Sequence, residues 1–260
     1  SSLISYNLEK LSCLRKACGV QFISSDSFDV IIEENGGKAT WGTPEAKEPF
    51  VKKFIKVHEL VAEPKATSKL IEDIKIDIEE FMALKIAESF ALAEDEAFLH
   101  GSGIEMPMGI LNTPAGKTPG FIEEVKGAFN ADAIFNLIDK LDSFYHANTA
   151  FLMNKETETE IKKLKDGSGR HLWQNRSNEV ANNTILGIPV FVSNFMPNIE
   201  SKERSIIFGN FQKGYKIVEK MGNYVMRDPF TERPFIKFYT SKKVGGDVID
   251  GNALKAFRLA

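Results

Sequence analysis

The sequence predicts an α+β protein, because three stretches of the chain carry three different patterns. Residues 28–61 are largely extended and predict a long hairpin, whereas residues 73–99 carry a helical stripe of apolar side chains. Residues 184–260 contain several short strands separated by turns. The chain has 260 residues, of which 43% are hydrophobic, so it can bury one large core or two smaller ones.

The N-terminal region predicts a short helix followed by extended chain. Apolar residues recur at helical spacing over residues 8–18, and residues 20–23 are extended. In the hairpin, side chains alternate over residues 28–33. Asn35-Gly36-Gly37 tolerate the positive φ of a turn, and residues 40–41 and 51–61 are again extended in character. An isolated two-stranded ribbon is only marginally stable in water, so we expect this hairpin to lie on something else.

A long helix is predicted over residues 73–99, where the apolar side chains share one broad stripe. At 1.5 Å per residue it would span ~40 Å, which is long enough for a strut across a domain. Gly101 and Gly103 permit the left-handed backbone that ends a helix, and Pro107 prevents its resumption. The acidic run Glu94-Asp95-Glu96 fits the helical pattern and has no recognisable catalytic partner, so we interpret it as structural.

The rest of the chain predicts an α/β unit followed by strands. Helices are expected over residues 131–145 and 155–165, with a short buried strand at 151–153 between them. We expect turns at Met221-Gly222, Asp228-Pro229 and Gly245-Gly246. The expected strands are residues 185–192, 205–208, 215–218, 223–226, 235–239 and 253–259.

Composition excludes several classes of protein. The chain has 33 basic and 36 acidic residues, and this net charge of −3 is not that of a dedicated nucleic-acid binder. Cys13 and Cys18 fit neither a disulfide framework nor a zinc site, so both are expected to be reduced packing residues. No apolar run approaches the ~20 residues of a membrane span, and the product is expected in the cytosol at synthesis. The first residue is Ser1 rather than Met, which favours proteolytic maturation or a trimmed sequence.

Residues that usually carry chemistry form no known motif. The four histidines are scattered, and Glu96 with His100, one helical turn apart, offers only two metal ligands. The loops at 101–103 and 167–169 lack the Lys-Ser or Lys-Thr of a phosphate-binding loop. We therefore expect no catalytic residue, no cofactor and no metal site.

A series of short motifs occurs in a fixed order along nearly the whole chain. The motifs are Glu94-Asp95-Glu96-Ala97-Phe98-Leu99 with Gly101-Ser102-Gly103, Pro107-Met108-Gly109-Ile110-Leu111, Phe151-Leu152-Met153-Asn154, Leu164-Lys165-Asp166 with Gly169-Arg170, Leu186-Gly187-Ile188-Pro189-Val190, Ile207-Phe208-Gly209-Asn210-Phe211 and Arg227-Asp228-Pro229-Phe230-Thr231. In this order they resemble the signature of tailed-bacteriophage major capsid proteins.

The resemblance implies the phage capsid fold and a division of the chain into its parts. An N-terminal arm would take residues 1–24 and an extended β-hairpin loop residues 25–62. A peripheral domain with the long spine helix would take 63–127 and 222–245, and an α/β axial domain 128–221 and 246–260.

The resemblance also implies a structural function. Copies would assemble as hexamers and pentamers into the icosahedral head of a phage or prophage, enclosing double-stranded DNA that they contact weakly and without sequence specificity. The protein would be a virion component assembled in the host cytoplasm, with scaffold, protease, portal and cement proteins as further partners and no membrane. The sequence does not reveal the phage, the host, the shell size or the cement proteins.

Two alternatives remain. An encapsulin-like nanocompartment would use the same fold to enclose cargo enzymes. A hydrolase with carboxylate chemistry at Glu94, Asp95 or Glu96 belongs to a different class, and replacing all three by amides would abolish its activity.

Six residues are candidates for contacts between subunits. Large aromatic residues in polar, turn-rich segments often anchor interfaces, although local packing within one subunit would also explain them. The candidates are Asn35, Gly36, Gly37, Trp41, Lys47 and Trp173.

The last expectation concerns covalent links between subunits, because some capsids of the resembled family form a Lys–Asn isopeptide bond assisted by a Glu. Lys47 is a possible donor, but no Asn lies near residues 235–238, and Asn223 and Asn252 are distant. Ser241-Lys242-Lys243 follow that strand, so a buried Glu is also hard to find. We predict a shell held by noncovalent contacts or by cement proteins. Denaturing electrophoresis should give one band at 29.0 kDa, and a ladder that survives boiling and reductant would contradict this.

Overall fold

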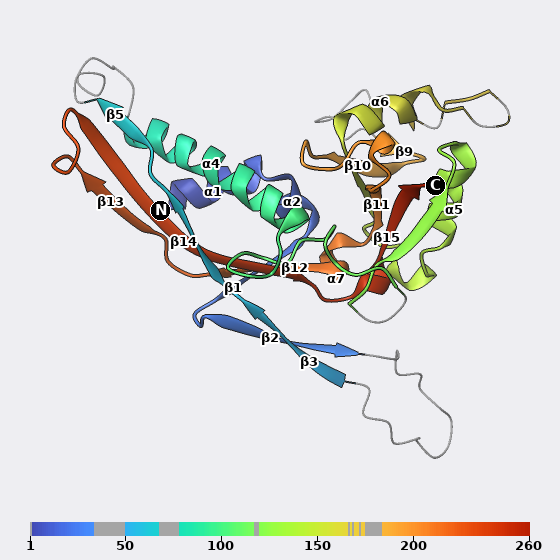
Figure 1. Ribbon diagram of the computed structural model, residues 1–260, viewed down its shortest axis with the longest axis horizontal. Helices are drawn as coiled ribbons and strands as arrows, with labels where there is room; N and C mark the ends of the chain where they lie inside the picture. The colour runs from blue at the N-terminus through green and yellow to red at the C-terminus, as the bar shows by residue number, and fades with distance from the viewer. Residues whose placement is uncertain are drawn as a thin grey trace.

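The computed structural model describes residues 2–33, 50–67, 78–116, 120–165, 167, 169–171, 173–174 and 184–260. Figure 1 shows an elongated lobe and a compact lobe, with a two-stranded ribbon that projects away from both. The mixed helix and sheet architecture confirms the predicted α+β class.

The elongated lobe is built on a six-stranded sheet, and its longest strand, β14, runs through the whole lobe (Figure 1). Only β1 is parallel to its neighbour; the other pairs are antiparallel. The order is β1 (Gly19–Ile23), β12 (Tyr215–Lys220), β14 (Phe235–Val248) and β13 (Tyr224–Asp228), with β4 (His58–Ala62) and β5 (Lys65–Thr67) also paired to β14.

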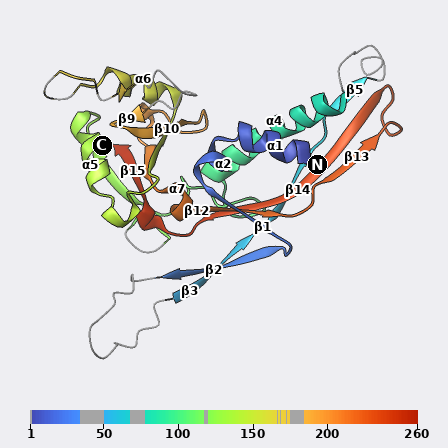
Figure 2. The ribbon, with the colours of Figure 1, turned by 180° about the vertical axis from the view of Figure 1, so that it is seen from behind.

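Three helices cover this sheet. The long helix α4 (Ile78–His100) confirms the predicted strut from residue 78 onward, and residues 73–77 lie outside the described part. Helices α1 (Ser2–Leu11) and α2 (Cys13–Ala17) lie along α4, as Figure 2 shows from behind. Ile4 and Leu8 of α1 bury their side chains against α4 and the sheet.

The glycines after α4 act through close contact as well as through backbone conformation. Gly103 has the expected left-handed φ of 77°, but Gly101 does not have a positive φ. A Cβ on Gly101 would lie 2.0 Å from the carbonyl oxygen of Pro107, and one on Gly109 2.4 Å from that of Leu99. The chain therefore folds back on the end of α4 at distances that only glycine allows.

The compact lobe contains a seven-stranded mixed sheet with helices packed on it (Figure 1). The sheet order is β6 (Glu123–Gly127), β15 (Leu254–Leu259), β11 (Arg204–Gly209), β7 (Ala150–Met153), β10 (Ile188–Val192), β9 (Thr184–Ile185) and β8 (Trp173–Gln174). The helical segments are α5 (Ala131–Asp139), η1 (Ser143–Tyr145), α6 (Lys155–Lys163), η2 (Ile199–Ser201), α7 (Phe211–Gly214) and η3 (Gly251–Ala253).

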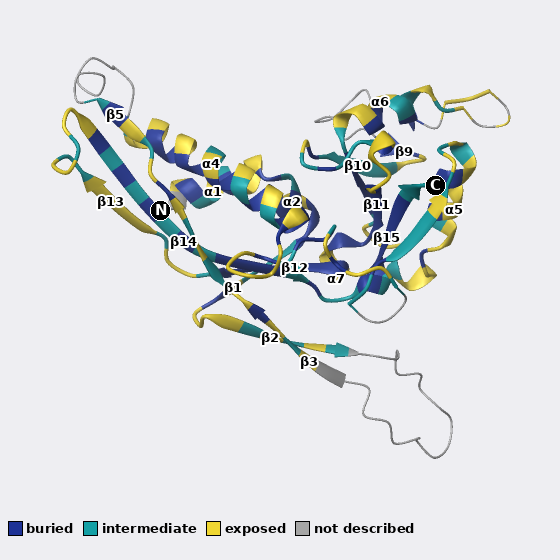
Figure 3. Ribbon diagram, in the orientation of Figure 1, coloured by how far each residue is buried: buried dark blue, intermediate teal, exposed yellow. Residues whose placement is uncertain are grey.

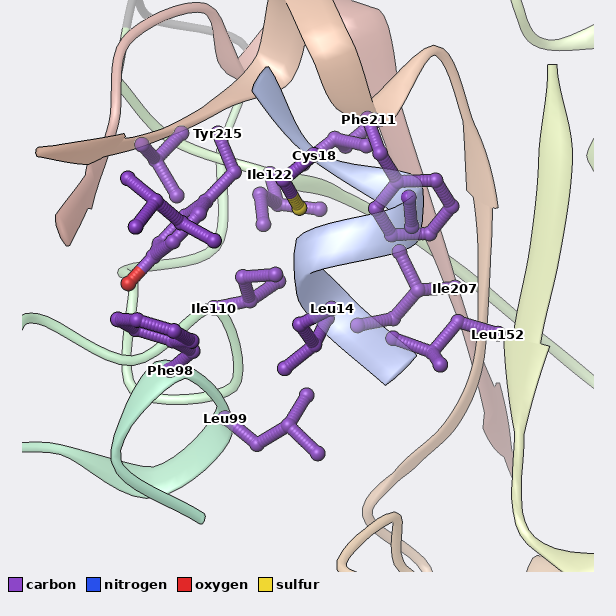
Figure 4. Packing of buried hydrophobic residues seen from close by; sticks show 14 of the residues in the cluster. Leu14, Cys18, Phe98, Leu99, Ile110, Ile122, Leu152, Ile207, Phe211 and Tyr215 are labelled. Carbon is purple, nitrogen blue, oxygen red and sulfur yellow. The ribbon is translucent and has the colours of Figure 1, made fainter. Parts of the chain in front are cut away.

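One hydrophobic core joins the two lobes. Leu14 and Cys18 extend from the short α2 segment into a cluster that also contains Phe98 of α4, Leu152 of β7 and Tyr215 of β12 (Figure 4). The Tyr215 hydroxyl donates a 2.7 Å hydrogen bond to the carbonyl oxygen of Met108, which satisfies both groups. Because elements of both lobes share this core, the lobes are held together by packing.

Three predicted element boundaries are wrong. The expected helix over 131–145 ends at Asp139, and η1 follows it as a separate turn. The expected strand over 185–192 is a hairpin, because Leu186 and Gly187 have positive φ values of 54° and 85°. Gly245 and Gly246 are not a turn; they lie within β14.

Candidate functional site

Four charged side chains form a buried ionic cluster between the helices and the sheet. Arg15 of α2 contacts Glu94 of α4 through Nε at 2.6 Å and Glu219 of β12 through Nη2 at 2.5 Å. The ammonium of Lys242, on β14, lies 2.8 Å from Glu94 and 3.1 Å from Glu219. None of the four side chains is more than 4% exposed. Two cations therefore neutralise two carboxylates out of contact with water.

Opposite charge outweighs burial in setting the pKa values of Glu94 and Arg15. Burial alone would raise the pKa of Glu94, but Lys242 and Arg15 lower it below its ordinary value. Burial would lower the pKa of Arg15, and Glu94 and Glu219 raise it instead. Glu94 and Arg15 are accordingly held in their charged forms.

Asp95 has a separate role at the start of α2. Its carboxylate accepts hydrogen bonds from the Ser12 hydroxyl at 2.6 Å and from the backbone N–H groups of Cys13 at 2.9 Å and Leu14 at 3.2 Å. These N–H groups have no partner within the helix, so Asp95 caps α2 from another element. Burial nevertheless raises the pKa of Asp95 above its ordinary value.

The acidic run at 94–96 thus has partners that sequence reasoning missed. Arg15 lies 79 positions from Glu94 and 204 positions from Glu219, so spacing along the chain gave no signal of the contact. The structural interpretation of the run is supported, because Glu94 and Asp95 are both buried and engaged. Within the described residues, no group of three or more His, Cys, Asp or Glu side chains could hold a metal ion.

The two-stranded ribbon consists of β2 (Ser27–Glu33) and β3 (Phe50–Lys56) in antiparallel register. Near its base, one face packs against its own subunit through Phe28, Val30 and Ile55. The opposite face leaves Ile31 71% exposed and Phe54 56% exposed. This surface, which we call the outer ribbon face, has no cover within the described part of the subunit (Figure 3).

A second uncovered surface lies along β13. This strand pairs only with β14 and is exposed over most of its length (Figure 3). The turn that follows presents Phe230 at 76% exposure. Asp228 accepts hydrogen bonds from the N–H groups of Phe230 and Thr231, so the exposed ring is carried on a braced turn.

The predicted interface residues fall into two groups. Asn35, Gly36, Gly37, Trp41 and Lys47 lie outside the described residues, so their contacts stay predictions. Trp173 lies in the core of the compact lobe, 9% exposed, with the Lys162 ammonium 4.5 Å from its ring centre. Trp173 therefore packs within its own subunit, which is the alternative explanation given for the aromatic candidates. A contact between Trp173 and a neighbouring subunit stays a prediction.

The expectation that a buried Glu would be hard to find near β14 is wrong. Glu94 and Glu219 both lie beside Lys242, brought there by α4 and β12. Each carboxylate is already paired with Arg15, so the cluster is a structural ion network. A noncovalent shell stays a prediction.

None of the helices within the described ranges has the length and apolar character needed to cross a membrane.

A family model and two solved structures that resemble this chain all describe the same kind of protein. The model of the phage capsid family matches residues 1–259. The capsid of a native GTA particle is 34% identical over 95% of this chain and 90% of its own, with a TM-score of 0.82. The capsid of the empty GTA particle gives 34% identity, coverage of 96% and 90%, and a TM-score of 0.80. No curated protein gave a significant match.

A more distant structure shares the fold alone. A virus-like particle from Pyrococcus furiosus is 16% identical over 99% of this chain and 97% of its own, with a TM-score of 0.64.

We predict that Lys242→Met lowers the free energy of unfolding by about 3–5 kcal/mol, because it leaves Glu94 and Glu219 with one buried cation between them. Adding Glu94→Gln to this variant rebalances the charges and should recover part of the loss. The surface variant Lys85→Met, which breaks an exposed pair with Glu88, should cost at most about 1 kcal/mol. Denaturant unfolding of the unassembled subunit measures all three; equal effects of Lys242→Met and Lys85→Met would show that the cluster is not a structural centre.

Acid should destabilise the subunit through Glu94. Its pKa in the folded protein is lowered, so its contribution is present above its ordinary pKa of 4.5 and is lost as the pH falls through the folded value. Asp95 acts in the opposite direction, because its raised pKa favours the protonated form and its contribution is lost as the pH rises. From about pH 5 to pH 3, stability should fall less steeply in Glu94→Gln and more steeply in Asp95→Asn than in the parent. Parallel stability–pH curves for the three proteins would be incompatible with this assignment.

Proposed function

This chain belongs to the phage capsid family and is a shell protein, and from that premise we propose that its copies form the hexamers and pentamers of an icosahedral head. The observation that carries the proposal is the correspondence with the GTA capsid, which extends over nearly all of both chains. Self-association of identical subunits is shared with the assembled shells of its relatives.

We propose the division of the chain that the resemblance implies. The peripheral domain would take residues 63–127 and 222–245, including α4, and the axial domain would take 128–221 and 246–260. These bounds follow the two lobes except at β12, which lies in the sheet of the elongated lobe, and at β6, which lies in the sheet of the compact lobe. The ribbon and β4 would form the described part of the extended loop, and α1 with α2 would form most of the N-terminal arm.

The contents and partners of the shell are also proposals. We propose that double-stranded DNA fills the head and is contacted weakly, which agrees with a net charge of −3. Scaffold, protease, portal and cement proteins would assist assembly in the host cytoplasm, and the mature product would be part of the virion. The role is structural rather than enzymatic, because Glu94 and Asp95 are occupied in holding the fold.

Purified particles provide the direct test of this function. Negative-stain electron microscopy should show rings or closed shells, and shells isolated from the native source should contain nuclease-protected double-stranded DNA. Shells filled with an enzyme and free of DNA would support the encapsulin-like alternative instead. A protein that stays monomeric under all assembly conditions would contradict both the proposed phage head and the encapsulin-like alternative.

The outer ribbon face gives a prediction about the contact between subunits. Ile31→Asp should impair ring and shell formation, because it replaces an exposed apolar side chain that a neighbour would cover with a charge that is costly to bury. Its effect on the melting temperature of the unassembled subunit should be small, since Ile31 is largely exposed there. Leu186→Ser, an exposed aliphatic residue on the β9–β10 turn, is the matched control and should assemble normally. Sedimentation measures assembly, and calorimetry measures the melting temperature of the unassembled subunit. Normal assembly of Ile31→Asp would show that the outer ribbon face is not part of the interface.

A further inference from the structure

The base of the ribbon passes β14 at Gly245, a point that we call the crossing, just before β4 pairs with the same strand. A Cβ on Gly245 would lie 2.1 Å from the backbone carbonyl oxygen of Lys56, the last residue of β3. The next glycine is restricted from the other side, because a Cβ on Gly246 would lie 2.4 Å from the Tyr215 hydroxyl oxygen. At the crossing, β3 and β14 therefore approach to a distance that only glycine permits.

Ion pairs lie on both sides of this crossing. Asp26, just before β2, accepts hydrogen bonds from the ammonium groups of Lys220 at 2.8 Å and Lys243 at 3.0 Å. Lys53 of β3 donates to the Asp247 carboxylate at 2.6 Å and to the Val248 carbonyl oxygen at 2.9 Å. We call these contacts the two ribbon clamps.

The clamps are arranged symmetrically along β14. Side chains two positions apart on a strand share a face, so Lys243, Gly245 and Asp247 all point toward the ribbon. Lys243 holds the start of β2 on one side of Gly245, and Asp247 holds β3 on the other. A tilt of the ribbon about Gly245 in either direction would stretch one clamp.

Packing alone does not fix the angle of the ribbon. Its apolar contact with the subunit is small and centres on Ile23, Ile55 and Val218. A hollow of about 240 Å³ opens beside the crossing, and its lining includes Lys56, His58, Met106 and Met108. The ribbon therefore has space to move into, and the ion pairs oppose that movement.

We propose that Gly245, Asp26 and Lys53 are positioning residues for shell assembly, which set the direction of the ribbon within each subunit before a neighbour binds. This inference rests on the proposed function, because a fixed direction matters only if the outer ribbon face contacts a second copy of the chain. The pairs are partly exposed to solvent, so the clamps are sensitive to salt. Their role is in geometry, since exposed pairs add little to overall stability.

The direction of the ribbon can be measured without assembly. Spin labels on Ile31→Cys and Leu92→Cys, both exposed, report the distance from the ribbon to α4 in the unassembled subunit. The native thiols label poorly, because burial raises the pKa of Cys13 to about 12 and also raises that of Cys18. The parent should give one narrow distance distribution at low salt. Molar salt, with a screening length of ~3 Å, should broaden it.

The variant Asp26→Asn/Lys53→Met should lose the narrow distribution at all salt concentrations and should assemble poorly or into irregular particles. Gly245→Ala should shift the mean distance, because β3 has to move away from the new methyl group. The matched controls are Lys163→Met, which breaks an exposed pair with Glu160, and Gly127→Ala, where a Cβ meets nothing within 4 Å. Both should keep the parental distribution.

A parental distribution in Asp26→Asn/Lys53→Met would overturn the inference, even if Gly245→Ala failed to fold. A protein that never assembles but shows the predicted loss of the narrow distance would refute the proposed function while leaving the clamps in place. A broad distribution in the parent at low salt would also overturn the inference.

Discussion

The subunit depends on the neutralisation of four buried charges that come from four separate elements. Arg15, Glu94, Glu219 and Lys242 attach α2, α4, β12 and β14 to one another at a point without solvent. Such a cluster contributes little net stability compared with apolar packing, but it is costly to break, because removal of one partner leaves an uncompensated buried charge. It therefore opposes any displacement of the N-terminal helices, the long helix and the sheet relative to one another.

The strand β14 transmits this arrangement to the surface. Its two faces have different partners, with Lys242 and Gly246 facing the helices and the core, and Lys243, Gly245 and Asp247 facing the ribbon. The same strand thus holds the ionic cluster on one side and the base of the projecting ribbon on the other. The described surfaces of β13 and of the outer ribbon face remain uncovered, as expected for a subunit that is completed by its neighbours.

Much of this architecture could be predicted from the sequence, and the exceptions have physical reasons. The spacing of apolar residues alone predicted the long helix and most strands, because one face of each element is buried. The partners of Glu94 could not be predicted, because a contact between residues 79 or more positions apart leaves no local pattern. Gly245 and Gly246 resemble a turn in sequence, yet the close approach of Lys56 and Tyr215 explains both within a strand. Trp173 has a polar sequence context but lies in the core, since α6 and the sheet of the compact lobe surround it from elsewhere in the chain.

The distance along the chain between the members of the ionic cluster also determines when a newly made subunit can fold. Arg15 emerges from the ribosome early, whereas Lys242 and its strand follow more than two hundred residues later, and domains fold only when their long-range contacts are available. Until β14 has been synthesised, Arg15 and Glu94 lack part of their charge partners, and the ribbon lacks the strand that it crosses. If the ribbon contacts a neighbouring subunit, as we propose, a nascent chain on a polysome cannot present a correctly directed ribbon to that neighbour. Shell growth is thereby restricted to chains in which β14 is complete.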